Sequence, residues 1–471
     1  MAVNEERDSV RIDIERLESS IKDMMSHDSL TSPKCCIFKT PAILYRHNEK
    51  AFIPNAFSIG PLHHGCPNLK ATEKIKAKYL QGLISRSGSL DTILKTLISS
   101  IMEVEKDARE CYADAIDYSP EELVKILVID GCFLIELFLK KTYLSLREEH
   151  DPIFSKSYMR QFLSHDLILL ENQLPWMVLE ILFDLTKDSY DENPLIILAM
   201  NFFDDTYLSY RMPPSNQVIN IEDIEHFVDL FRKLSTLSST DSHPVQSINF
   251  ECIKHFVDLF RKLSTLSSTL FRKVKTSSNI LLGISTIEES QETPCGWEFV
   301  PSATSLVESG VKFKRSTSQS ILDVKFNDGV LEIPPFQIHE VTETVFRNLI
   351  SYEQCHSYRC DRITSYAILL ASLINTAKDV DILCDNKIID NWLNPDDAAQ
   401  LFNKLYLDAY VYYRYTDLSR QVNSFCQRRW PRWRRALVRN YFNTPWAILS
   451  TLAAVILLIL TLVQTVYAVK K

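Results

Sequence analysis

The sequence predicts a mainly α-helical protein, with a large helical body, a small β-hairpin element at about residues 311–334 and a C-terminal single transmembrane helix. Three observations carry this prediction. The 471 residues include only nine glycines, whereas sandwiches, β-helices and glycine-rich nucleotide loops need many positions with positive φ. Apolar residues recur at helical spacing between recognisable helix caps. Residues 446–469 carry no charge, as a bilayer-spanning helix requires.

Four segments are predicted: an N-terminal amphipathic helix in 1–32, a helical domain at 33–426, a basic juxtamembrane segment at 427–445 and the transmembrane helix at 446–469. In the first segment, apolar residues alternate by four and three with charges between them, so its apolar stripe would dock on the body or pair with another helix. No apolar signal-peptide core is seen at the N-terminus. Eleven cysteines without paired CxxC spacing are typical of reduced thiols, which predicts a cytosolic body.

The first part of the helical domain passes from proline-rich turns to apolar helix. Five prolines within residues 33–67 forbid a continuous helix and predict extended strands and turns there. Ser119 and Pro120 then form the cap and the first position of an apolar helix. This helix contains Asp130 and Glu136, which need buried partners.

A second apolar segment covers residues 166–185, and Pro175 is expected to kink it or to divide it into two helices. Asp166 is expected to cap its start. Asn172 and Gln173 precede the proline, where their side chains can satisfy the backbone groups that the proline frees.

An internal copy follows, because residues 219–240 recur as residues 248–269 with 19 of 22 positions identical. Solenoid repeats diverge at surface positions and need three or more copies, so this pair indicates a recent local duplication. We expect one copy to keep the original structural role and the other to be an insertion. His226 and His255 are copies of each other and are therefore no evidence for a metal site.

After the duplication, short alternating runs predict the hairpin, with Asn327-Asp328-Gly329 as its turn. Helical periodicity then returns. Helices are expected at 339–355, 361–376, 394–415 and 417–439.

The predicted transmembrane helix is long enough to cross a hydrocarbon core of about 30 Å, although a buried core helix would show the same pattern. No acidic residue follows Asp417, whereas nine lysines and arginines do. This asymmetry predicts a single-pass protein of the plasma membrane or endoplasmic reticulum with its body in the cytosol, and it conflicts with a receptor-like body outside the cell. The residues expected at the membrane interface are Arg428, Arg429, Trp430, Arg432, Trp433, Arg434, Arg435 and Arg439.

The stretch SIGPLHHG at residues 58–65 places two adjacent histidines between two glycines. The glycines have the spacing of a phosphate loop, but the lysine and the serine or threonine that such a loop needs are missing. The histidines could centre a metal or catalytic site. The competing interpretation, which we prefer, is a rigid connector whose imidazoles hold backbone carbonyls. The residues of this motif are Gly60, Pro61, His63, His64 and Gly65.

Recognised catalytic signatures are missing from the sequence, which contains no zinc-protease, serine-hydrolase, dinucleotide or kinase motif. We therefore assign no catalytic, cofactor-binding or metal-ligating residue and no cofactor. A net charge of −8 argues against a nucleic-acid partner.

Seven stretches together resemble one known family. In chain order they are CCIFKTPAILYRHNEKAFIPNAF, SIGPLHHG, DGCFLIELFL, DLILLENQLPW, HFVDLFR, SATSLVESGVKFK and LEIPPFQIHEVTETVFRNLISYEQ. From about residue 10 to its end, the chain looks like the plant family called domain of unknown function 247. The resemblance implies a helical body with a terminal anchor and no established catalytic residue. The doubled HFVDLFR segment departs from the single copy of that family.

We therefore expect a membrane-anchored plant protein that acts in protein interaction, recognition or signalling, with the lipid bilayer and an unidentified protein as its partners. The alternative is a hydrolase or metal-dependent enzyme centred on His63 and His64.

Overall fold

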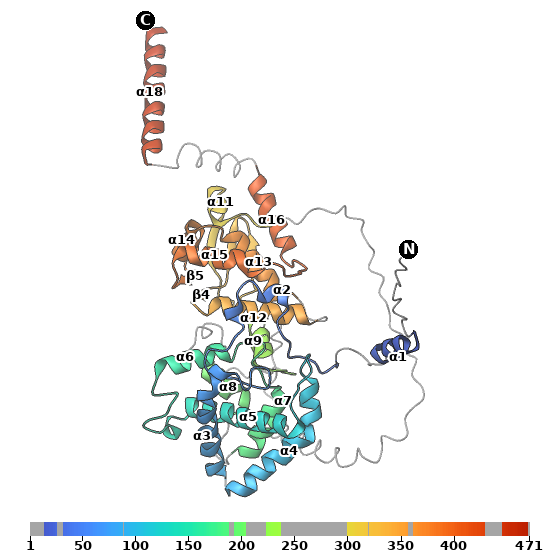
Figure 1. The fold of residues 1–471 in the computed structure, drawn as a ribbon. Helices are drawn as coiled ribbons and strands as arrows, with labels where there is room; N and C mark the ends of the chain where they lie inside the picture. The colour runs from blue at the N-terminus through green and yellow to red at the C-terminus, as the bar shows by residue number, and fades with distance from the viewer. Residues whose placement is uncertain are drawn as a thin grey trace, which may run out of the picture. The chain divides into compact units, whose positions relative to one another are not determined.

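The computed structural model describes residues 14–25, 32–87, 89–187, 193–203, 223–236, 299–318, 320–356, 361–428 and 445–469. Within these ranges the chain is mainly helical with a few short strands, as predicted (Figure 1). The α-helices are α1 (Ile14–Met25), α2 (Ala42–Tyr45), α3 (Lys70–Ser87), α4 (Leu90–Glu110), α5 (Pro120–Thr142), α6 (Ser157–Asp166), α7 (Trp176–Thr186), α8 (Leu195–Phe203), α9 (Phe227–Thr236), α11 (Ala303–Glu308), α12 (Thr342–Cys355), α13 (Arg362–Leu373), α14 (Ala377–Asp385), α15 (Pro395–Leu405), α16 (Thr416–Gln427) and α18 (Pro445–Val469). The 3₁₀ turns are η1 (Glu49–Ala51), η2 (Pro67–Leu69) and η3 (Leu144–Leu146), and the strands are β1 (Lys312–Arg315), β2 (Lys325–Asn327), β3 (Val330–Ile333), β4 (Phe336–Ile338) and β5 (Ile389–Asn391).

The chain forms two compact units, each assembled from separate stretches of sequence. The first unit comprises residues 1–236, 302–304 and 335–415, and the second comprises residues 237–301, 305–334 and 416–471. The motif at residues 58–65 belongs to the first unit.

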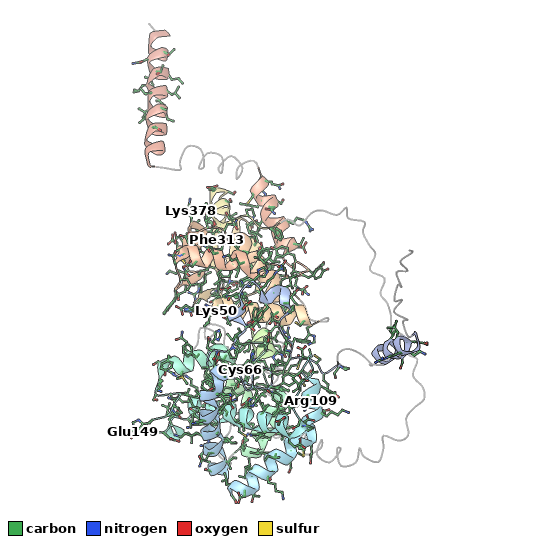
Figure 2. The ribbon with its side chains drawn as sticks, in the orientation of Figure 1. Lys50, Cys66, Arg109, Glu149, Phe313 and Lys378 are labelled. Atoms are coloured by element: carbon green, nitrogen blue, oxygen red, sulfur yellow. The ribbon has the colours of Figure 1, made fainter. Side chains whose placement is uncertain are left out.

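Helix α5 is the centre of the N-terminal helices of the first unit and packs against α3, α4, α7 and α8 (Figure 1). Side chains fill the space among these helices (Figure 2). The predicted capping box is present, because the Ser119 side chain accepts the Glu122 N–H and the Glu122 carboxylate accepts the Ser119 N–H. Both predicted buried acids find partners on α3, since Asp130 pairs with Lys76 and Glu136 with Arg86.

The proline-rich segment before α3 differs from the predicted extended strands. It contains the single helical turns α2 and η1, and its one strand-like feature among the described residues is a bridge between Ile37 and Tyr112. Pro41 starts α2, so the prolines here shorten helices to one turn rather than impose strands.

The segment around Pro175 is divided into two helices. This is one of the two outcomes that the sequence predicted, the other being a kink. Helix α6 ends at Asp166 and α7 begins at Trp176, directly after Pro175. The prediction that Asp166 caps a helix start was wrong, because this residue ends α6 and its buried carboxylate holds backbone N–H groups elsewhere.

The remainder of the first unit contains α12 to α15 and the parallel pair β4–β5, in register from Phe336 opposite Ile389. The helix predicted at 394–415 begins as expected, where Asn394 accepts the Asp396 N–H, but it ends at Leu405. The backbone leaves helical geometry at Tyr406, with φ of −102° and ψ of 7°, and Asp408 follows with a positive φ of 61°. The tyrosine-rich run that follows favours extended backbone over helix.

In the second unit, β2 and β3 form the predicted antiparallel hairpin. Its turn residues Asp328 and Gly329 have φ of 45° and 83°, as a type I′ turn requires. Strand β1 adds to β3 in parallel and completes a three-stranded sheet in the order β1-β3-β2.

The predicted transmembrane helix at 446–469 is not supported. Crossing a bilayer takes about 20 consecutive, predominantly apolar residues in one helix. No helix in the described ranges is both long enough and apolar enough to do so. That part of the predicted fold class was therefore wrong.

Candidate functional site

We call the stretch SIGPLHHG at residues 58–65 the signature motif. Buried side chains from distant parts of the sequence hold the backbone just before this motif and within it. The Asp166 carboxylate, which is fully buried, accepts the N–H groups of Asn55 at 2.7 Å, Ala56 at 2.8 Å and Phe57 at 2.8 Å. Three converging donors satisfy a carboxylate that could not otherwise remain buried. Asp166 therefore fixes the path of the chain into the motif.

Asn172 and Asp130 continue this clamp into the motif itself. Asn172 accepts the Ile59 N–H at 2.7 Å and donates its amide to the Phe57 carbonyl at 3.0 Å. Asp130 accepts the Gly60 N–H at 2.9 Å. We call residues 55–60, together with Asp130, Asp166 and Asn172, the backbone clamp.

A buried lysine neutralises one acid of the clamp. Lys76 is 0% exposed, and its Nζ lies 2.5 Å from Asp130 Oδ1 and 2.9 Å from the Ser58 carbonyl. Burial alone would lower the pKa of Lys76, but the Asp130 and Glu73 carboxylates raise it above its ordinary value. The lysine therefore stays charged and serves as a structural counter-ion for Asp130.

The two motif glycines adopt backbone that other residues avoid. Gly60 and Gly65 have φ of 76° and 81°. A Cβ on Gly60 would lie 2.4 Å from the Gln173 carbonyl oxygen, whereas the nearest atom to a Cβ on Gly65 would be the Tyr118 hydroxyl at 3.9 Å. Both positions need glycine for conformation, and Gly60 also needs it for space.

Gln173 joins the stretch just after α6 to the start of α9. Its amide nitrogen donates to the carbonyls of Leu167 at 2.8 Å and Leu169 at 2.7 Å, and its amide oxygen accepts the Phe227 N–H at 3.0 Å. Gln173 thus binds backbone groups, but its carbonyl partners lie on the stretch just after α6 and are not groups that Pro175 frees, so the predicted reason for its placement was wrong. The segments that carry the family resemblance thus bind one another.

The motif histidines do not hold carbonyls as expected. Among the described atoms, Nε2 of His63 and Nδ1 of His64 are buried without a hydrogen-bond partner. The His64 ring instead meets Tyr118 edge to face, with ring centroids 5.8 Å apart, and the Tyr118 hydroxyl donates to the His64 carbonyl at 3.1 Å. The loop is held by its backbone rather than by its imidazoles.

His63 is the motif residue with the most chemical potential. Its Nε2 lies 3.9 Å from Glu171 Oε2, which is too far for a hydrogen bond. Burial lowers the pKa of His63 and raises the pKa of Glu171, so both groups favour their neutral forms. The other Glu171 oxygen accepts the Thr40 N–H at 2.9 Å. The structure thus brings together one predicted residue and one acid, but at a separation that does not form a hydrogen-bonded acid–base pair.

One cluster of potential metal ligands occurs among the described residues, formed by Cys36, Glu225 and His226. His226 uses both ring nitrogens already, because Nε2 lies 2.9 Å from the Cys36 carbonyl and Nδ1 accepts the Asp229 N–H at 3.3 Å at the start of α9. A hydrogen bond with the Cys111 thiol, together with burial, raises the pKa of Cys36 far above its usual range. Without a metal ion the thiol therefore favours its protonated form, and both ring nitrogens of His226 are engaged with backbone groups.

A surface that the sequence reasoning missed lies after α15. Tyr410 and Tyr412 are 83% and 72% exposed, among the most exposed large side chains of the described chain. Residues 409–413, which we call the tyrosine segment, were predicted to be helical and are neither helix nor strand. The alternating aromatic pattern of AYVYY was the available signal, because β-branched and aromatic residues at period two favour extended backbone.

Side chains of the first unit hold the tyrosine segment in place. The Gln354 amide nitrogen donates to the Tyr410 carbonyl at 2.7 Å, and its oxygen accepts the Tyr410 N–H at 2.8 Å. Asp361 accepts the Tyr412 N–H at 3.0 Å, and the Ser365 hydroxyl donates to the Tyr412 carbonyl at 3.0 Å. Four hydrogen bonds thus fix a short exposed stretch without regular secondary structure.

The start of the segment is anchored separately. Asp408 binds both Arg46 and His47, the latter at 2.7 Å. Hydrogen bonds from Arg46 and then from His47 lower the pKa of Asp408. The backbone that carries the two tyrosines is therefore fixed both at Asp408, before the segment, and at residues 410 and 412 within it.

Of the predicted membrane-interface residues, Arg428 is described, and its guanidinium lies 5.3 Å from the ring centroid of Phe425. The others lie outside the described residues, namely Arg429, Trp430, Arg432, Trp433, Arg434, Arg435 and Arg439. The second copy of the duplication, residues 248–269, also lies outside them, whereas the first copy supplies α9.

Comparison with known proteins agrees with the resemblance in sequence. The chain is 26% identical over 452 residues to UPF0481 protein At3g47200 of Arabidopsis thaliana, covering 94% of this chain and 88% of that protein. It is 26% identical over 513 residues to the putative UPF0481 protein At3g02645 of the same plant, covering 95% of this chain and 93% of that protein. No solved structure matches the chain. The model of the family DUF247, described as plant protein of unknown function, matches residues 37–460, and the chain therefore belongs to this family.

Proposed function

We propose that this plant protein is a protein-interaction component that recognises its partner through the tyrosine segment. The observation that carries the proposal is the exposure of Tyr410 and Tyr412, at 83% and 72%, on a backbone fixed by four side-chain hydrogen bonds. Large aromatic side chains in water serve no packing role in the body. Their placement on a held backbone is typical of a binding surface.

Two features of tyrosine support this assignment. Tyrosine is enriched at binding hot spots, because it offers a large amphipathic contact area with few rotatable bonds to immobilise. A backbone that is already ordered also loses less conformational entropy when a partner binds. Both effects favour affinity from a small surface.

The enzyme alternative centred on His63 and His64 has weaker support. Gly60, which shares their motif, is committed to the backbone clamp. His63 faces Glu171 at 3.9 Å, which is beyond hydrogen-bonding distance. A catalytic pair needs hydrogen-bond reach to its substrate and a positioned third group.

Site-specific photo-cross-linking tests the proposal. Benzoylphenylalanine replaces Tyr410 in the full chain, and the matched control replaces Trp392, an aromatic residue of the first unit that is 69% exposed. In plant extract, we expect a discrete protein adduct from position 410 that is absent from position 392. The adduct should disappear when Tyr412→Ala is added. Equal adducts from both positions, or an adduct that survives Tyr412→Ala, would overturn the proposal.

A further inference from the structure

We infer that the partner presents an extended peptide, which adds to the tyrosine segment as a β-strand. This inference rests on the proposed function and specifies how recognition occurs. It is carried by the alternation of backbone hydrogen bonds along residues 410–412.

Tyr410 and Tyr412 turn their backbone groups toward the body of the first unit. Gln354 binds both the N–H and the C=O of Tyr410, and Asp361 with Ser365 binds those of Tyr412. In an extended chain, the N–H and C=O of alternate residues point to the same side, as they do in a ladder with a neighbouring strand. Three side chains thus take the place of an inner strand.

Val411, between the two tyrosines, must then point its N–H and C=O to the opposite side. Neither group has a hydrogen-bond partner in the portion of the chain that the structure describes, and the residue is partly exposed. The segment therefore presents one open donor and one open acceptor on its outer edge. An open, held edge of this kind is what strand addition uses for affinity.

The side chains add selectivity to this edge. Tyr410 and Tyr412 lie two residues apart, so they project from the same face of the extended segment, and Tyr413 on the other face is only 2% exposed. A strand added beside them would place alternate residues against the two rings. Aromatic and β-branched residues make the most favourable cross-strand pairs with tyrosine. We therefore expect a partner segment with alternating apolar side chains.

Substitution of Val411 separates strand addition from other binding modes. Val411→Pro removes the open N–H, and it should fold because proline and the residue before it both accept extended backbone. Val411→Ala is the matched control, since it shortens the same side chain but keeps the N–H. The probe is a phage library of random 12-residue peptides selected on the full-length protein.

We expect enriched peptides with alternating apolar residues, which bind wild type and Val411→Ala alike. Binding to Val411→Pro should be at least about tenfold weaker, because the peptide loses one backbone hydrogen bond and buries an unpaired carbonyl. Amide hydrogen exchange at Val411 should slow when such a peptide binds, and the unfolding midpoint of Val411→Pro shows that the variant is folded.

Three outcomes would overturn the inference. Peptides that bind Val411→Pro as tightly as wild type, yet lose affinity in Tyr412→Ala, would refute strand addition while the proposed function stands. Failure to enrich any peptide would refute a linear partner segment. Self-association of the full chain that Val411→Pro abolishes would identify the occupant as a second copy of this protein.

Discussion

Alanine substitution of the two motif glycines separates a close backbone contact from conformational strain alone. Gly60 and Gly65 have φ of 76° and 81°, so an alanine at either position pays the same left-handed penalty, about 1–2 kcal/mol. The added methyl group differs, because it would lie 2.4 Å from the Gln173 carbonyl oxygen at position 60 but 3.9 Å from its nearest neighbour at position 65.

The overlap at position 60 cannot be relieved by a rotamer change, since the obstructing atom belongs to the backbone of a buried residue. Gln173 is 0% exposed, and its side chain makes hydrogen bonds on both sides of Pro175. Overpacking of this kind costs about 1–3 kcal/mol more. We therefore expect Gly60→Ala to destabilise the protein by about 2–5 kcal/mol and Gly65→Ala by about 1–2 kcal/mol.

Urea unfolding of the full-length protein, followed by far-UV circular dichroism and tryptophan fluorescence, measures both variants. Of the six tryptophans, Trp176 is only 4% exposed and meets Phe227 edge to face, so its share of the emission reports on the packing beside Gln173. Equal destabilisation by the two substitutions would refute the close approach of Gly60 to Gln173. A larger effect at Gly65 would refute the reasoning altogether.

Three further predictions concern the clamp and the neighbouring histidine. Asp166→Ala should lower the free energy of unfolding by about 3–6 kcal/mol, because three N–H groups lose their acceptor, whereas the exposed control Asp184→Ala should stay within about 0.5 kcal/mol in the same urea experiment. Lys76→Met should cost about 3–5 kcal/mol by leaving Asp130 buried without its cation, and adding Asp130→Asn should restore part of that loss in denaturant titrations; no recovery would contradict the pairing. His63 has a folded-state pKa below its unfolded value, so the unfolded chain binds more protons than the folded chain as the pH falls from 7.5 to 5.5. Wild type should therefore lose more free energy of unfolding over this range than His63→Asn. Parallel pH profiles of the two proteins would refute the lowered pKa.

Local signals in the sequence predicted the elements whose causes are local. The Ser119 cap, the division at Pro175 and the hairpin turn at Asp328-Gly329 each depend on a few adjacent residues, and each is present. The helix that was expected to continue to residue 415 ends at Leu405. Its length depended on whether the chain stays helical or becomes extended through the tyrosine segment, whose residues favour β-structure. Side chains more than 40 residues away decide between the two, as Gln354 and Asp361 do for Tyr410 and Tyr412.

The roles of the motif residues were predictable only in part for the same reason. Positive φ at Gly60 and Gly65 follows from the motif, and the structural interpretation of the loop agrees with the backbone clamp. The acceptors of that clamp are Asp130 in α5, Asp166 at the end of α6 and Asn172 in the connection between α6 and α7, all far along the chain. No sequence spacing could assign them to residues 55–60, and one of them was mistaken for a helix cap. The transmembrane prediction was wrong for a different reason. It rested on composition alone, and no described helix provides such a span.

In this protein we infer that the motif at residues 58–65 holds the fold, while the tyrosine segment binds the partner. Photo-cross-linking from position 410 tests this claim most directly when it is repeated in two folded variants, Tyr412→Ala and His63→Asn. We expect the partner adduct to be lost with Tyr412→Ala and retained with His63→Asn. Loss with His63→Asn and retention with Tyr412→Ala would contradict it.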